Sequence, residues 1–260
     1  MNTRKKWAFS FLASGAFLVL GTALLVLNPG FLYARRTVTP HYVIYHTRSL
    51  DPDWLPRLAQ ARALDQRSGC FDPALRLNIC LNDGSPYPAL VERLQGPAFA
   101  WGFARNVVLS GAANARANYV ALHGYRWNLT QLLAHEATHC HQLQCLGFWH
   151  ANPVAGYPTW KWEGYAEYVA RGAPASPSLR HQVRRLQQAE QTSPHAWALT
   201  LPDGTSASRE YANYLLLTTY CLEVKQMSYR QLLADTASEQ TVHRQLRNWF
   251  EQENSKESLE

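Results

Sequence analysis

The chain has 260 residues, 47% of them hydrophobic and 12% aromatic, which excludes a disordered polymer and allows one compact domain with a sizeable core. The formal net charge is +6, but residues 1–36 contain no acidic residue and five of the 25 basic residues, which leaves 20 basic against 19 acidic residues elsewhere; the five are Arg4, Lys5, Lys6, Arg35 and Arg36. Because the remainder is nearly neutral and has no basic stripe with interleaved aromatic residues, we expect no nucleic-acid partner.

The first predicted element is an uncharged apolar segment at residues 7–27, which as a helix would span a bilayer core of about 30 Å. Three basic residues precede it and two arginines follow it, and the positive-inside rule favours a cytoplasmic N-terminus. We therefore expect residues 1–36 to form a cytoplasmic tip, a single-pass transmembrane signal anchor and a linker, with the domain extracytoplasmic (periplasmic or extracellular). A cleaved signal peptide is the alternative, although no small-x-small cleavage site follows the apolar run.

Strand patterns come first in the remainder of the chain, and helical patterns follow. Alternating β-branched and aromatic residues predict strands over 41–46, 75–81 and 99–109, the last broken at Gly102. Helical spacing of apolar residues predicts helices over 55–67, 128–146, 160–171, 178–191, 209–224, 228–237 and 240–250. This order predicts an α+β domain over residues 37–252, with a small N-terminal sheet and a mostly helical C-terminal part, followed by a frayed charged tail at 253–260.

Five cysteines occur, and an extracytoplasmic location would permit disulfides between them. The pairs closest in sequence are Cys70–Cys80 and Cys140–Cys145, which would leave Cys221 alone. Spacing does not fix the pairing, and small buried thiols are the alternative.

The segment LLAHEATHCHQ contains the pattern His-Glu-x-x-His at His135, Glu136 and His139. Two histidines four residues apart lie on one face of a helix, where both rings can reach one ion. Glu136 follows the first histidine and is placed to accept a proton from an activated water. Asn128 predicts an N-cap for this helix, and Gly147 predicts its end. The competing interpretation is a helix with two solvated histidines.

Downstream, the segment WKWEGYAEY places Glu163 and Glu167 four residues apart on a second predicted helix, among bulky aromatic residues. A carboxylate in such surroundings is expected to be partly buried, and a buried acid needs a partner or a metal. The residues between His139 and Glu163 are enough for the chain to turn and bring the second helix back onto the first.

The pattern His135-Glu136-x-x-His139 followed by Trp-x-x-Glu163-Gly-x-Ala-Glu167-Tyr resembles the gluzincin zinc metallopeptidases, over residues of about 129–171. The resemblance implies that Glu163, which precedes the glycine, is the third zinc ligand. It also implies an upstream sheet whose edge strand binds substrate backbone and a helical C-terminal part. The metzincin peptidases are disfavoured, because they need glycine and histidine where this chain has Gln142 and Cys145.

Three protein ligands leave one coordination position open, which is typical of a catalytic Zn²⁺ site. We expect Glu136 to act as general base. The tetrahedral oxyanion needs another donor, and the resemblance implies a tyrosine of the downstream helical region, with Tyr211 and Tyr214 as candidates. Glu167 is expected to hydrogen-bond the second ring nitrogen of a ligating histidine and so orient the ring, although a solvated acid is the alternative.

The strand 105–110 is the candidate for pairing with an extended peptide or protein substrate. Gluzincin aminopeptidases resemble one another in a Gly-x-Met-Glu-Asn segment near this place, whereas this chain has Gly111-Ala-Ala-Asn114, so an endopeptidase fits better. Two other functions stay open: an amide hydrolase acting on a cell-wall or other non-protein substrate, and a non-catalytic membrane-tethered binding or scaffold protein with a metallopeptidase fold. A structural zinc site closed by Cys145 or His150 is a further alternative.

Overall fold

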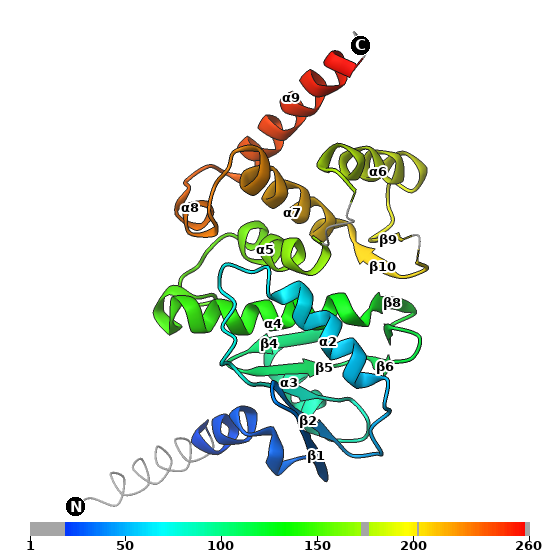
Figure 1. The fold of residues 1–260 in the computed structure, drawn as a ribbon, viewed down its shortest axis with the longest axis vertical. Helices are drawn as coiled ribbons and strands as arrows, with labels where there is room; N and C mark the ends of the chain where they lie inside the picture. Colours follow the sequence, from blue (N-terminus) through cyan, green and yellow to red (C-terminus); the bar gives the residue numbers. More distant parts are fainter. Residues whose placement is uncertain (1–18, 173–176, 202, 258–260) are drawn as a thin grey trace, which may run out of the picture.

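The structure is a computed structural model that describes residues 19–172, 177–201 and 203–257 (Figure 1). Its largest sheet has the strand order β1 (Arg35–Val38), β2 (Tyr42–His46), β3 (Leu77–Cys80), β5 (Asn106–Leu109) and β4 (Ala100–Phe103). The three central strands β2, β3 and β5 are parallel, while β1 and β4 run antiparallel to them at the two edges. The fold is therefore α+β with a mixed sheet, as the order of the elements predicts.

Two faces of this sheet carry different helices. Apolar side chains of β2, β3 and β5 pack on one face against α2 (Trp54–Asp65) and α4 (Leu129–Leu146) in one core cluster. Alternate residues of the same strands point to the other face, where α3 (Tyr87–Gln95) covers a smaller cluster. A three-stranded antiparallel sheet, formed by β6 (Ala112–Asn114), β7 (Tyr119–Leu122) and β8 (Tyr125–Asn128), leads directly into α4.

A second core cluster joins the helices of the C-terminal half. Its elements are α5 (Thr159–Arg171), α6 (Leu179–Thr192), α7 (Arg209–Thr219), the π-helical segment η3 (Tyr220–Val224), α8 (Tyr229–Ala234) and α9 (Glu239–Glu257). Helix α5 lies between α4 and α7 (Figure 1). Gly164 allows its close approach to α7, because a Cβ there would lie 2.6 Å from the backbone oxygen of Tyr214. A hairpin of β9 (Ala198–Thr200) and β10 (Ser206–Ser208) connects α6 to α7.

Most predicted elements are present, with shifts of a few residues at their ends. The segment 99–109 is two strands joined at a turn, and 209–224 is an α-helix that continues as a π-helix. The sequence interpretation missed β1, α3, the sheet β6–β8 and the hairpin β9–β10. Helix α9 runs to Glu257, through most of the segment expected to be a frayed tail, and residues 258–260 lie outside the described residues.

The predicted membrane anchor at 7–27 is corrected by the structure. Residues 7–18 lie outside the described residues, and the described part forms a helix over 19–27. In the described parts of the chain, no helix combines the length and apolarity needed to cross a membrane. The transmembrane helix in the predicted fold is therefore not supported, and neither is the single-pass location inferred from it.

The structure decides between the two possibilities left open for the cysteines: all five are free thiols, so neither Cys70–Cys80 nor Cys140–Cys145 is a disulfide. One expectation about the sheet is wrong. The strand over 105–110 is not an edge: β5 lies between β3 and β4, and its residues are buried. The edge strand on that side is β4. The chain reverses at Ala104, so β4 runs antiparallel to β5 and pairs with β5 alone among the described strands.

Candidate metal centre

Helix α4 begins and ends where its sequence predicts. The Asn128 side chain accepts a hydrogen bond from the backbone N–H of Gln131 at 3.1 Å, and Gly147 ends the helix with a φ of 81°. The helix therefore holds His135 and His139 one turn apart on the same face. Their rings stand nearly perpendicular, at 83°, with centroids 4.8 Å apart.

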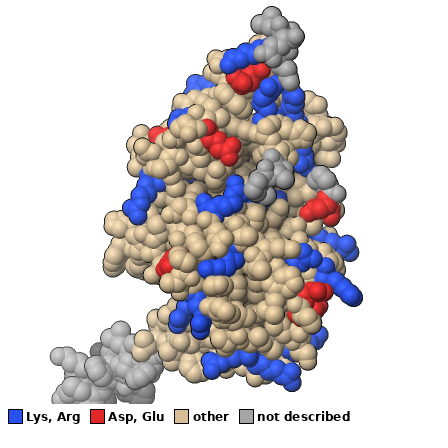
Figure 2. Space-filling view, viewed as in Figure 1, with Lys and Arg blue, Asp and Glu red and all other residues tan. Residues whose placement is uncertain are grey.

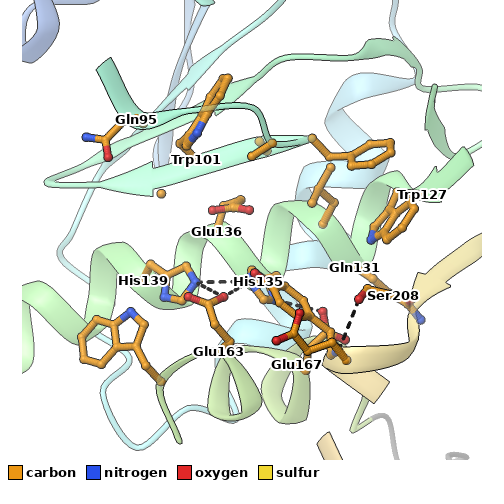
Figure 3. Close-up of a pocket in the computed structure, with 18 of the residues that line it drawn as sticks. Gln95, Trp101, Trp127, Gln131, His135, Glu136, His139, Glu163, Glu167 and Ser208 are labelled. Atoms are coloured by element: carbon orange, nitrogen blue, oxygen red, sulfur yellow. Dashed lines mark hydrogen bonds and ion pairs between the residues drawn. The ribbon is translucent and has the colours of Figure 1, made fainter. Parts of the chain in front are cut away.

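Glu163 of α5 completes a cluster with these two histidines (Figure 3). Its Oε2 lies 3.2 Å from Nε2 of His135 and 3.3 Å from Nε2 of His139, and the two Nε2 atoms are 3.2 Å apart. All three side chains are at least half-buried. The ligand set predicted from the two motifs is thus brought together, and this cluster could hold a metal ion.

Gln142 fixes the ring of His139. Its Oε1 lies 2.7 Å from Nδ1 of His139, while its Nε2 donates to the hydroxyl of Tyr229 at 2.6 Å. An amide oxygen only accepts, so Nδ1 carries the ring proton and Nε2 presents its lone pair to the cluster. The ring also stacks on Trp162, at 5.9 Å between centroids and 10° between planes. The sequence interpretation did not assign either contact.

Glu167 has the position expected of it, beside the other ligating histidine. Its Oε1 lies 3.1 Å from Nδ1 of His135, at ion-pair distance though not in the alignment of a good hydrogen bond. Burial acts to raise the pKa of Glu167, but Arg171 and His135 outweigh it and lower the pKa to about 2. Because the carboxylate is ionised and can only accept, it favours the proton on Nδ1 and leaves the lone pair on Nε2.

The three ligand atoms are all acceptors, so the cluster needs a cation. Although burial opposes charge on every member, the two histidines hold the pKa of Glu163 well below its usual range. The carboxylates in turn raise the pKa of both His135 and His139 despite their burial. Metal binding at this cluster requires both Nε2 atoms to be deprotonated.

Glu136 lies on the other side of the cluster, between α4 and the edge strand β4 (Figure 3). Burial raises its pKa, and the backbone N–H of Gly102 donates a hydrogen bond to it. Gly102 is necessary for this approach, because a Cβ there would lie 2.1 Å from the backbone oxygen of Glu136. The absence of a side chain at Gly102 therefore lets β4 and α4 come into backbone contact beside Glu136.

The two candidate tyrosines have different surroundings. Tyr211 lines the cavity beside the cluster, and its ring stacks on His135 at 5.8 Å and 9°. Burial raises its pKa far above the usual range, so the hydroxyl stays protonated. Tyr214 is buried and donates to Glu210 at 2.6 Å, and it does not line this cavity. The geometry therefore favours Tyr211 as a donor.

The cavity has a volume of about 470 Å³. Edge strand β4 forms one side of it, through residues 99–103. Aromatic residues form the end of the cavity near the start of α4. The ring of Phe99 stacks on that of Trp127 with 4.2 Å between centroids, and the centroids of Trp127 and Trp197 are 5.6 Å apart. Trp197 remains half-exposed at the rim. The site is thus a cleft, with edge strand β4 along one side and an aromatic cluster at one end.

Cys145 and His150, the alternatives for closing a structural site, are not in the cluster. His141, which also lies on α4, pairs with Asp65 at 2.8 Å and so ties α4 to α2. His150 lies in the 3₁₀ segment η2 (Phe148–His150), and Cys145 lies 4.0 Å from Arg230.

Comparison with known proteins gives no family for this chain. No protein-family model, no curated protein and no solved structure matches it. The resemblance to the gluzincins consequently stands on the two motifs, and the function has to be argued from the chemistry of the cleft.

Proposed function

We propose that the protein is a zinc-dependent hydrolase, and within that class an endopeptidase. The observation that carries the proposal is the placement of the buried Glu136 carboxylate beside a three-ligand His-His-Glu cluster, at the bottom of a cleft. A purely structural metal site has no use for a free carboxylate at that place. An open cleft also gives a substrate access to the fourth coordination position.

The donor set fits zinc. Zinc holds nitrogen and oxygen ligands at about 2.0–2.2 Å, so tetrahedral geometry separates its ligand atoms by roughly 3.3–3.6 Å. The three separations here are 3.2, 3.2 and 3.3 Å. A zinc ion bound by His135, His139 and Glu163 would supply Lewis-acid chemistry, activating water and polarising a scissile carbonyl group.

The residues of the chain supply the proton transfers. Glu136, whose pKa is raised by burial, accepts a proton from the attacking water and passes it to the leaving nitrogen. Tyr211, kept protonated by burial, donates a hydrogen bond to the oxyanion that forms at the former carbonyl. Gln142 and Glu167 hold the ring protons on Nδ1 of the two histidines, which orients the rings.

The substrate proposed for this cleft is an extended peptide. Strand β4 has a neighbour on one side only and lines the cavity, so its free backbone groups can pair with a peptide. The aromatic end formed by Phe99, Trp127 and Trp197 favours a bulky apolar side chain next to the cleaved bond.

The test compares wild type with Glu136→Gln. The amide keeps the shape of the side chain but cannot accept the proton, so we expect a loss of peptide cleavage of about 10²-fold or more with unchanged zinc content. Zinc is measured by elemental analysis, and cleavage with a mixture of unstructured peptides and of peptidoglycan fragments. Equal turnover by both proteins would exclude Glu136 as the base. Cleavage of peptidoglycan fragments alone would support a hydrolase but contradict the proposal that its substrate is an extended peptide.

A further inference from the structure

We propose that a second cavity binds a phosphate group, with the side chains of Arg36, Arg76 and Arg105 as its ligands. The cavity has a volume of about 460 Å³ and lies where residues 27–31 meet the main sheet. Tyr45 and Asn78 line it, and these residues belong to the α3 face of the sheet. The cavity is therefore on the face opposite α4 and is separate from the metal centre.

The three arginines come from three segments that the sheet brings together. Arg36 is on edge strand β1, Arg76 directly precedes β3, and Arg105 lies in the turn before β5. Arg76 and Arg105 are neighbours because β3 and β5 are parallel and paired, with Asn78 opposite Asn106. The lysine and arginine atoms in Figure 2 gather in the region of β1 and β2 without acidic atoms among them.

These guanidinium groups have unused hydrogen-bonding capacity. Arg76 donates one bond from Nε to the backbone oxygen of Pro40 at 3.3 Å, and its terminal nitrogens have no hydrogen-bond partner among the residues that the structure describes. The side chains of Arg36 and Arg105 make no hydrogen bond or ion pair with another residue that the structure describes. Among the residues that the structure describes, no carboxylate lines the cavity. Three like charges around one concave site are stabilised by an anion with several acceptor oxygens.

Phosphate matches this site better than a single carboxylate does. Its oxygens can accept bidentate hydrogen bonds from more than one guanidinium group, and its charge offsets more of the repulsion. The apolar rim of the cavity includes Leu27 and Phe31, both exposed. The phosphate can therefore belong to a soluble phosphate ester or to the headgroup of an anionic phospholipid, which share the chemistry recognised here.

The experiment uses the full chain and two probes. Inorganic phosphate is titrated calorimetrically, and vesicles of phosphatidylglycerol are compared with vesicles of phosphatidylcholine by co-sedimentation. Arg76→Gln and Arg105→Gln should each weaken binding about tenfold or more, because each removes a charge-assisted hydrogen-bond donor. Arg93→Gln is the matched control, since it removes the same charge from an exposed position on α3 outside the cavity.

Each outcome decides the proposal. Binding of inorganic phosphate that is lost in both cavity variants supports a soluble ester, and binding of phosphatidylglycerol vesicles alone with the same loss supports a lipid headgroup. Equal losses of affinity in the cavity variants and in Arg93→Gln would show that binding depends only on the net charge of the protein, and would overturn the proposed site. Absence of binding of either probe to wild type would overturn it as well. Melting temperatures of the variants establish that each is folded.

Discussion

The buried side chain of Gln142 orients the ring of His139. The sequence motif predicts the position of this candidate ligand but not the orientation of its ring. The amide is fully buried and bonds His139 on one side and Tyr229 of α8 on the other. It therefore connects the position of the His139 ring, a candidate metal ligand, to the packing of the C-terminal helices. Partners of this kind contribute to metal affinity because they fix the tautomer and the orientation of the ring.

We predict that Gln142→Leu weakens zinc binding by about 10- to 100-fold, because the Nδ1 proton of His139 loses its acceptor in a buried site. Affinity is measured by competition with a chromophoric chelator. Gln144→Leu is the matched control, since Gln144 is exposed on the same helix. Equal affinities of the two variants would show that Gln142 does not orient the ring.

Among single residues, the sequence predicts the candidate metal ligands, because their positions follow from the spacing within two short motifs. His135 and His139 follow from the helical repeat, and Glu163 from the second motif. Gln142 and Arg171 lie three and four residues from His139 and Glu167, so helical spacing allows both contacts without predicting them. Their second partners lie 87 and 40 positions away in the chain, and those contacts depend on packing. Tyr211 and Tyr214 are three residues apart on one helix, and only packing determines that Tyr211 reaches the cleft.

The edge strand β4 is the element on which the proposed substrate site depends. Sequence patterns predict strands here but do not reveal strand order, and they favour the more apolar strand β5 as the edge, whereas the structure places β4 there. The burial of β5 indicates a central strand, because β5 is covered on both faces and paired on both sides. Gly102, predicted only as a break, is the point where β4 contacts α4.

We predict that Gly102→Ala lowers both stability and proposed peptidase activity. The added Cβ would lie 2.1 Å from a backbone oxygen of α4, so the strand must move away from Glu136, and overpacking of this kind costs about 1–3 kcal/mol. Thermal unfolding and peptide turnover are both measured. The control is Gly69→Ala, whose Cβ would make an ordinary contact of 3.6 Å with Tyr165. Wild-type behaviour of Gly102→Ala would mean that the contact is not tight.

In the whole molecule, the candidate metal centre lies between two halves with separate cores. The sheet and α4 form one core and the helices from α5 onward form the other, and the ligands come from both. The sequence predicts this division into a sheet-containing half and a helical half through the order of its patterns. It did not predict the three-stranded sheet β6–β8, whose short strands have weak patterns.

Because ligands from both halves would hold the proposed zinc ion, we predict that metal removal destabilises the whole molecule. At a free zinc concentration of 1,000 times the dissociation constant, binding adds about 4 kcal/mol to the free energy of unfolding. For a chain of this size, that corresponds to a decrease in melting temperature on the order of 10 °C when zinc is chelated. Calorimetric scans of the wild type with zinc and with a chelator measure the difference. Glu163→Ala removes the ligand from the second half, so its melting temperature should respond much less to the chelator. An equal response of both proteins would show that zinc does not bind across the two halves.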